Sequence, residues 1–262
     1  MWPLHRLLMR AEVHSASCTD GRLEVAGTSG QPYRHRMNAL QKRSLGALAR
    51  MQTILAGALF VPAGGAFRFW QGWLYWFLYL AGVLAITLHF LKHDPALMER
   101  RLALGPRAEP RSRQKIIQAL MAVFVIALLG VSGFDHRFRW SEVPVPVVLL
   151  GDMLVLARFI VLFFVYRENR YASATIEVST GQRVVSTGPY RLVRHPMYAG
   201  ASLLIVATPV ALGSLVALPL VLPPLGVLVA RVLDEERLLI GELPGYSEYC
   251  HQVRYRLVPL IW

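Results

Sequence analysis

The chain has 262 residues, of which 55% are hydrophobic and 17% charged, and its mean hydropathy is +0.42. This composition is too apolar for a soluble domain of that size and predicts a polytopic membrane protein. The net charge of +12 does not indicate nucleic-acid binding, because the basic residues lie in short loops between apolar runs, where they orient helices in an anionic membrane. The two cysteines, Cys18 and Cys250, form no cluster with other ligands, so neither a disulfide framework nor a metal site is expected.

Residues 1–44 are polar and basic and contain no apolar core of signal-peptide length. We expect them to form a disordered basic tail in the cytosol. Residues 45–165 are expected to hold four membrane helices, because apolar segments run over residues 45–62, 70–91, 116–134 and 145–165. A basic loop at 92–115, with seven Lys and Arg residues, separates the second segment from the third.

A last apolar region at 197–230 predicts a helical hairpin, with arms at 197–212 and 215–230 and a break at Gly213-Ser214. Each arm has about 16 residues, near the lower limit for crossing a ~30 Å core, so full and partial crossing both stay open. The predicted fold is an all-α polytopic membrane helix bundle of about five to six membrane helices, with the hairpin last.

Lys and Arg residues predict the topology. The tail, the 92–115 loop, the 166–195 loop and the region after residue 230 are basic, so both termini are expected in the cytoplasm. The 135–142 loop fits least well, because it contains Arg137 and Arg139, which Asp135 and Glu142 balance in charge, on the side expected to be outside. The Arg-His-Pro turn described next would then share the cytosolic face with the 92–115 loop.

The stretch 186–200 reads S-T-G-P-Y-R-L-V-R-H-P-M-Y-A-G. Gly188-Pro189 is a turn signal, and Pro196 keeps His195 extended while it starts a helix. A helix start beside Arg194 and His195 offers free N–H groups to an anionic ligand group. The alternative is a basic membrane-flanking loop that only sets topology.

Two adjacent carboxylates favour the ligand-binding interpretation. Glu235 and Glu236 follow about 35 residues of almost uncharged sequence. A helical hairpin of that length returns them to the Arg-His-Pro turn.

The pattern R-H-P-x-Y, an apolar stretch and then E-E resembles the integral-membrane methyltransferases related to isoprenylcysteine carboxyl methyltransferase and phospholipid N-methyltransferase. The likeness includes residues 167–171, 244–249 and 253–259 and covers roughly residues 50–262. The chain looks like a bacterial-type member of this family. It implies a cytosolic S-adenosylmethionine site in residues 166–262 of a bacterial inner-membrane protein. The methyl acceptor would be a hydrophobic or lipid-like molecule reached from the bilayer.

The resemblance also implies residue roles. His195 and Tyr198 would hold the amino-acid end of the cofactor, Pro196 and Gly200 would shape the turn, and Glu235 or Glu236 would accept hydrogen bonds from its ribose or amino group. Tyr190 is a further cofactor candidate, although anchoring at the membrane interface is preferred for it, as for Tyr249 and Tyr255.

Arg231 would orient an acidic group of the acceptor, and Arg194 is the second candidate for that role. Tyr246 and Arg158 are candidates for contacting the acceptor. Arg158 and Asp152 lie inside the fourth apolar segment, where a charge usually faces protein or a polar cavity. Both could form a polar lining for the substrate headgroup. The alternative for Asp152, which is preferred, is a position near the outer membrane interface, and the alternative for Arg158 is a bond to a neighbouring helix.

Methyl transfer from a sulfonium is an in-line displacement. A carboxylate acceptor is already ionised at pH 7 and needs no general base, whereas an amine must first be neutral. The protein then aligns the reactants and excludes water. The sequence leaves carboxylate and amine acceptors both open.

Two other functions stay open. Residues 246–259 also resemble the C-terminus of NADPH-dependent sterol reductases, which are longer proteins. A non-catalytic membrane protein is the third possibility, and it leaves the Glu pair without a purpose.

Overall fold

The computed structural model describes residues 31–65, 67–102, 112–171 and 181–262. Residues 37–262 form one compact unit. Residues 1–30 of the expected disordered tail lie outside the described residues.

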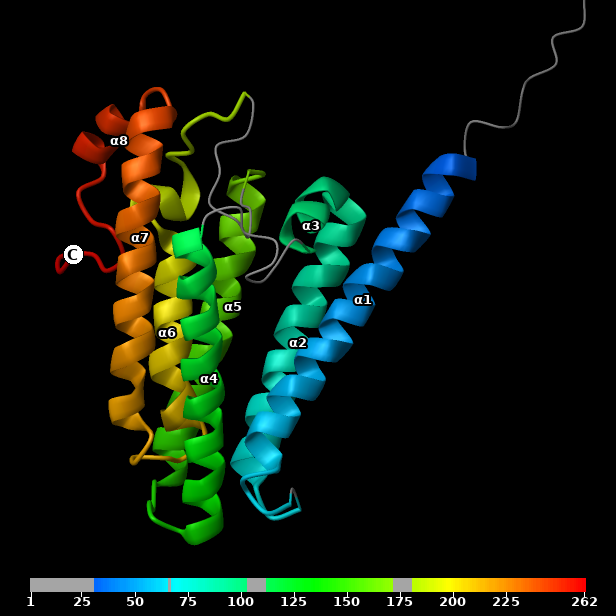
Figure 1. The fold of residues 1–262 in the computed structure, drawn as a ribbon, viewed down its shortest axis with the longest axis vertical. Coiled ribbons are helices and arrows are strands. Elements are labelled where there is room, and N and C mark those ends of the chain that lie inside the picture. Colours follow the sequence, from blue (N-terminus) through cyan, green and yellow to red (C-terminus); the bar gives the residue numbers. More distant parts are fainter. Residues whose placement is uncertain (1–30, 66, 103–111, 172–180) are drawn as a thin grey trace, which may run out of the picture. The chain divides into compact units, whose positions relative to one another are not determined.

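The described residues form helices and no strands, which confirms the all-α membrane bundle (Figure 1). The α-helices are α1 (Gln31–Phe60), α2 (Trp70–His93), α3 (Pro95–Leu102), α4 (Ser112–Phe138), α5 (Val145–Glu168), α6 (Pro196–Ala211), α7 (Leu222–Glu242) and α8 (Tyr246–Gln252). Two short 3₁₀ helices, η1 (Gly188–Arg191) and η2 (Leu218–Val221), precede α6 and α7.

Among the described residues, α2, α4 and α5 are long and apolar enough to cross a membrane. They match three of the predicted segments closely. Helix α6 is apolar but has only 16 residues. The prediction of five to six membrane helices therefore stays a prediction beyond these three.

The prediction of disorder was wrong for residues 31–44, which are helical in α1. Pro32 lies in the first turn, where its missing N–H costs nothing. Leu40, Ser44, Leu55 and Leu59 are buried at helical spacing along one face. Burial of this face stabilises the helix, whereas Lys42 and Arg43 are exposed.

The second arm of the hairpin also differs from the prediction. Helix α7 begins at Leu222, not at residue 215, and continues to Glu242. Pro223 and Pro224 lie in its first turn, where proline is tolerated, and Pro219 lies in the preceding 3₁₀ helix. The Glu pair is therefore part of α7.

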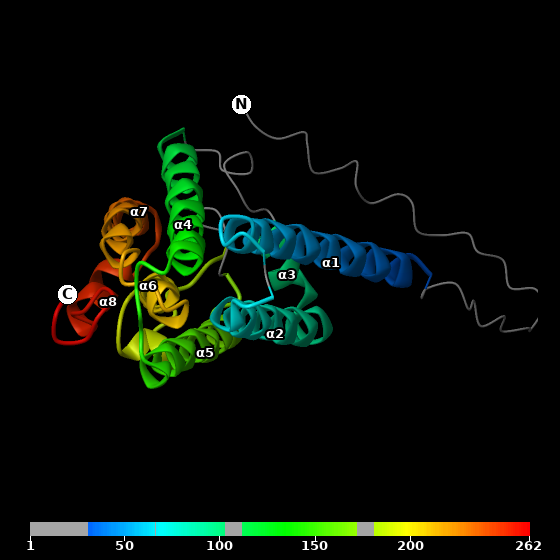
Figure 2. The ribbon, with the colours of Figure 1, turned by 90° about the horizontal axis from the view of Figure 1, so that it is seen from below.

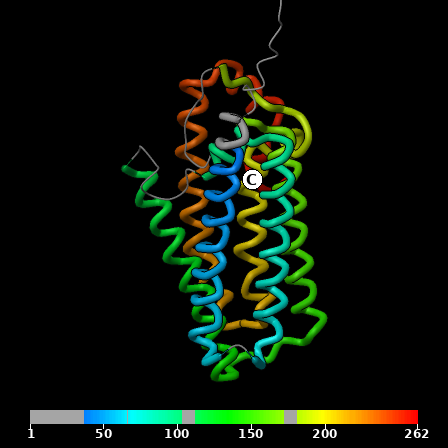
Figure 3. The backbone as a smooth tube through the Cα atoms, turned by 90° about the vertical axis from the view of Figure 1, so that its right-hand side faces the viewer, coloured from blue at the N-terminus to red at the C-terminus, as the bar shows by residue number. Residues whose placement is uncertain are grey.

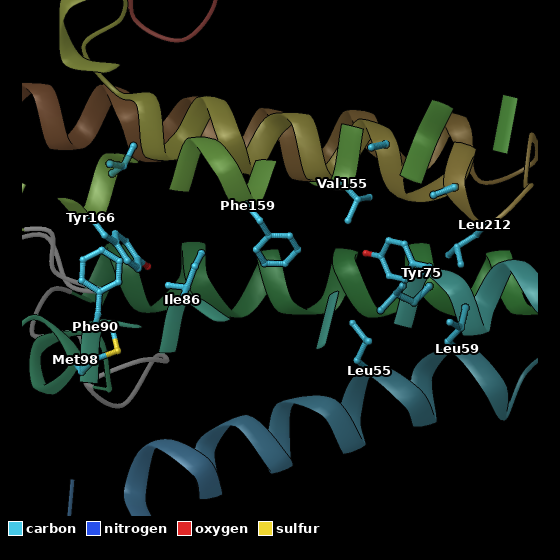
Figure 4. Close-up of a cluster of buried hydrophobic side chains, with 14 of the residues drawn as sticks. Leu55, Leu59, Tyr75, Ile86, Phe90, Met98, Val155, Phe159, Tyr166 and Leu212 are labelled. Carbon is cyan, nitrogen blue, oxygen red and sulfur yellow. The ribbon is translucent and has the colours of Figure 1, made fainter. Parts of the chain in front are cut away.

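Helix α5 packs along α6, with α2 against its other side, while α4 packs against α7 (Figures 1 and 2). Buried apolar side chains of α1, α2 and α5 meet in one core (Figure 4). In that core Phe159 and Val155 of α5 point towards α2, which carries Tyr75. Inside this core the Tyr75 hydroxyl lies 3.0 Å from Oγ1 of Thr208 in α6.

The helix connections sort to two ends of the unit. The α1–α2, α4–α5 and α6–α7 connections gather at one end, and α3, η1 and α8 gather at the other (Figures 1 and 3). The Arg-His-Pro turn and the described parts of the 92–115 loop share that second end, as predicted. The side of the membrane that this end faces stays a prediction.

Close packing of α5 on α6 depends on Gly151, because a Cβ there would lie 2.4 Å from the Ala211 backbone nitrogen. We expect Gly151→Ala to lower the free energy of unfolding by about 1–3 kcal/mol, since backbone must move. Gly226→Ala is the matched control, because a Cβ there meets nothing within 4 Å. Thermal unfolding in detergent measures both, and equal effects of the two changes would contradict the packing role.

Candidate functional site

The turn before α6 has the predicted local structure. Gly188 has φ 56°, in the left-handed region that favours glycine, and it starts η1. A Cβ at Gly188 would also lie 2.5 Å from Cγ of Glu168. His195 is non-helical, with φ −124° and ψ 63°, and α6 begins at Pro196.

The C-terminal segment, residues 253–262, holds this turn in place. The backbone N–H of Arg194 donates to the carbonyl of Tyr255, and that of His195 donates to the carbonyl of Arg256, both at 2.9 Å. The segment folds back on itself, because the N–H groups of Arg256 and Leu257 donate to the Trp262 carbonyl at 2.9 and 3.0 Å. The start of α6 is therefore fixed by residues about 60 positions downstream.

Glu236 connects the turn, the C-terminal segment and α7. Its carboxylate is buried, with Oε1 at 3.2 Å from Nε of Arg194 and 3.3 Å from Nε2 of His195. Nε of Arg256 donates to Oε2 at 2.7 Å. Burial raises the pKa of Glu236, but hydrogen bonds from His195 and Arg256 and the charges of its partners outweigh it, so the pKa falls to about 2.

Glu235 has different surroundings. Its Oε2 accepts a hydrogen bond from the Tyr198 hydroxyl, at 2.5 Å, and the side chain lines a cavity beside the turn. The Tyr198 hydroxyl in turn accepts from Nε of Arg231 at 3.0 Å. A single chain of contacts therefore links Arg231 through Tyr198 to the cavity-facing carboxylate.

The cavity has a volume of about 100 Å³ and is bounded by η1, the start of α6, the last turns of α7 and α8. Seven of the predicted site residues line it: Tyr190, Arg194, His195, Pro196, Tyr198, Glu235 and Tyr246. The structure therefore brings together most of the residues that the sequence proposed.

Four predicted site residues lie outside the lining: Arg158, Gly200, Arg231 and Glu236. Gly200 faces α5, since a Cβ there would lie 3.6 Å from Val161 and 3.8 Å from Cγ of Arg158. The Arg158 guanidinium lies 4.5 Å from the Phe159 ring centre. Asp152, for which a position near the outer membrane interface was preferred, is buried and does not line the cavity.

The tyrosines were partly misassigned. Tyr249 is only 4% exposed and donates to the Tyr190 carbonyl at 2.7 Å, so interfacial anchoring is wrong for it. Tyr190 accepts from the Asn169 side-chain amide at 2.9 Å, and burial raises the pKa of Tyr190 to about 12. The Tyr246 hydroxyl lies 3.4 Å from Nε2 of His195 and can fix the orientation of that ring.

Sequence reasoning missed two residues of the site. Gln114 of α4 has no exposed surface, donates to Asp234 and accepts from Nη1 of Arg231 at 3.3 Å. In the sequence, Gln114 is a polar residue at the start of an apolar helix. An exposed glutamine at a helix end gives the same pattern, so the pattern did not single Gln114 out. Arg256 belongs to the C-terminal pattern, but only the fold shows that it reaches Glu236.

The basic loop also reaches this site. Nη1 of Arg101 lies 3.6 Å from the sulfur of Met197, next to the start of α6, and the same guanidinium lies 5.1 Å from the Tyr166 ring centre. Arg101 therefore borders the residues that begin α6.

The low pKa of Glu236 makes stability depend on pH. Its contribution is fully present above about pH 4.5, its unfolded value, and is lost as the pH falls towards about 2. Thermal unfolding between pH 7 and 3 should show a melting temperature that falls below pH 4.5. Glu236→Gln should melt lower at pH 7 and fall less steeply. Glu248→Gln, at an exposed position of α8, is the control and should behave like wild type.

Comparison with known proteins shows that the site lies in a part of the chain that matches a protein family. Residues 146–242 match the phospholipid methyltransferase family, which confirms the resemblance seen in the sequence. The matched region covers α5, α6 and α7 and contains both the Arg-His-Pro turn and the Glu pair. The family that it matches is one of methyltransferases.

The chain is also similar to a reductase. It is 33% identical to the Delta(14)-sterol reductase of Mus musculus over 91 residues. The aligned stretch covers 34% of this chain and 22% of the mouse protein. The chain therefore spans about a fifth of the length of that curated relative.

Proposed function

We propose that this protein transfers a methyl group from S-adenosylmethionine to a carboxylate or amine of a lipid-like acceptor at the cytosolic face of the membrane. The observation that carries this proposal is the cavity at the start of α6. There His195, Tyr198 and Glu235 converge within the region that matches the methyltransferase family.

The donor set suits this cofactor. The free N–H groups at the start of α6, with His195, can hold its carboxylate. Glu235 can accept from a ribose hydroxyl or the amino group, and its negative charge favours a positive sulfonium. When bound, the cofactor supplies an activated methyl group.

The cavity must widen for binding. Its volume of about 100 Å³ is below the roughly 300–1,000 Å³ of small-molecule sites. The Tyr198–Glu235 hydrogen bond crosses from α6 to α7 and is the contact that a ligand can replace. Glu236 keeps its three basic partners during this exchange, so the turn itself need not move.

Arg231 is positioned on the other side of Tyr198, held by Gln114 of α4. A guanidinium there can bind an acidic group of an acceptor in two-pronged fashion. Alignment of the acceptor with the methyl group and exclusion of water are then the main contributions of the protein.

An NADPH-dependent reductase is the second candidate, favoured by the partial likeness to the sterol reductase of mouse. That likeness covers 22% of the mouse protein, whereas the methyltransferase family matches three consecutive packed helices around the site. A non-catalytic role is third, and it leaves the cavity-facing Glu235 unexplained.

Binding separates these candidates. S-adenosylhomocysteine should bind the detergent-solubilised protein in calorimetry, and NADPH should not. Glu235→Gln should weaken that binding by about tenfold, because a charge-assisted hydrogen bond is roughly twice as strong as a neutral one. Glu248→Gln removes the same charge from exposed α8 and should bind normally. Stabilisation by NADPH alone would favour the reductase, and binding of neither ligand would favour the non-catalytic role.

Arg231 and His195 should differ in their effects. His195→Ala is expected to weaken S-adenosylhomocysteine binding and slow turnover. Arg231→Ala should leave binding nearly unchanged but slow methyl transfer by on the order of 100-fold, since misplacing an acceptor by about 1 Å has that effect. Arg231→Lys should recover part of the rate.

The rate is measured in single turnovers with methyl-labelled S-adenosylmethionine and a membrane lipid extract as the acceptor. If Arg231→Ala loses cofactor binding as severely as His195→Ala, Arg231 belongs to the cofactor site. Arg194 is then the next candidate for orienting the acceptor.

A further inference from the structure

A second hollow lies at the end of the unit opposite the candidate site. It has a volume of about 940 Å³ and is lined by residues of the α1–α2, α4–α5 and α6–α7 connections. These connections are drawn at the bottom of Figure 1. Its lining contains Arg68, His136, Arg137 and Arg139, with Glu142 as the one carboxylate among the described lining residues. We call it the basic hollow.

The three guanidinium groups of the basic hollow form no ion pair with a described residue. Asp135, adjacent in sequence, is directed elsewhere. Its carboxylate accepts from the N–H and hydroxyl of Ser141, both at 2.7 Å, and from the hydroxyl of Ser214 at 2.5 Å. This carboxylate joins the α4–α5 and α6–α7 connections and forms no ion pair with the arginines, so Glu142 is the one carboxylate among the described lining residues to set against three guanidinium groups.

Two contacts position basic side chains in the hollow. The His136 ring stacks on Phe69, with ring centres 4.1 Å apart. Gly64 has φ 73°, and a Cβ there would lie 3.2 Å from Cδ of Arg137, so the backbone lies close against that side chain. The hollow is therefore shaped by packing as well as by charge.

Exposed aromatic rings lie beside this hollow and indicate its depth in a membrane. Phe134, Phe138 and Trp140 stack in succession on the outside, with ring centres 6.2 and 5.3 Å apart, and all are at least 40% exposed. The Arg137 guanidinium lies 5.4 Å from the Phe138 ring centre. Trp140 follows the end of the candidate span α4, and tryptophan is enriched at the headgroup level of a bilayer. The arginines are then at the depth of lipid phosphates.

We propose that the basic hollow binds a phosphate group, and that its source is the headgroup of an anionic phospholipid. Arginine forks match phosphate oxygens bidentately, and clustered arginines without acidic partners favour an anionic ligand. The same charge explains why the 135–142 loop departs from the topology pattern, because a bound anion offsets its arginines. The site is independent of the proposed methyl transfer.

Ligand binding to the purified protein in mild detergent tests this at low salt. Phosphatidylglycerol in mixed micelles should raise the melting temperature and bind saturably. Inorganic phosphate tests the free anion as the source, and oleate tests an anionic lipid without phosphate. Added salt should weaken binding, since exposed charges are screened.

The variant R68Q/R137Q/R139Q should lose the phosphatidylglycerol effect, and Arg137→Gln alone should weaken binding by about tenfold. The control K42Q/R43Q/R50Q removes the same charge from exposed positions of α1 and should keep the effect. If the triple variant does not fold, the single variants Arg68→Gln and Arg137→Gln give the same comparison.

The outcomes are distinct. Stabilisation by phosphatidylglycerol that needs the hollow arginines supports the lipid source, and equal stabilisation by inorganic phosphate assigns free phosphate instead. Stabilisation by oleate equal to that by phosphatidylglycerol overturns phosphate recognition. No binding to wild type, or equal loss in both triple variants, overturns the site.

Discussion

The carboxylate of Glu236 is the interaction on which the site depends. It is buried and draws together basic groups from two separate segments, Arg194 and His195 of the turn and Arg256 of the C-terminal segment. A buried carboxylate without partners is strongly unfavourable, and so are clustered cations without an anion. Neutralisation therefore holds α7, the turn and the C-terminal segment in one arrangement, and that arrangement fixes where α6 begins.

Two adjacent acids of the same type have different tasks because they share a helix. Successive residues of an α-helix point about 100° apart, so Glu236 faces the turn while Glu235 faces the cavity. Glu236 is bound by fixed protein cations. Glu235 has a hydroxyl partner that a ligand can replace. The Glu236 carboxylate holds the elements of the site together, and the Glu235 carboxylate is available to bind a ligand.

The sequence predicted what local chemistry determines. Long apolar runs predicted α2, α4 and α5, and Pro196 predicted the start of α6. It could not separate Glu235 from Glu236, because that requires the rotation of α7 against its neighbours. Gln114 was missed because its two partners, Asp234 and Arg231, lie on a helix far away in sequence. Residues 31–44 were misassigned because their apolar face is recognisable only when the helix continues into the core.

The two ends of the unit differ in how their charges are balanced, and this difference indicates different ligands. At the candidate site, Arg194 and Arg256 are neutralised by Glu236, so Glu235 is the carboxylate that lines the cavity without a cation bound to it. A positive group of a ligand suits that carboxylate. Beside the basic hollow the carboxylate of Asp135 is satisfied by hydroxyl and N–H groups, and it forms no ion pair with the arginines that line the hollow. Because hydroxyl groups satisfy the hydrogen-bonding capacity of the Asp135 carboxylate, no arginine is needed to neutralise it. The arginines at this end of the unit can therefore bind an anion.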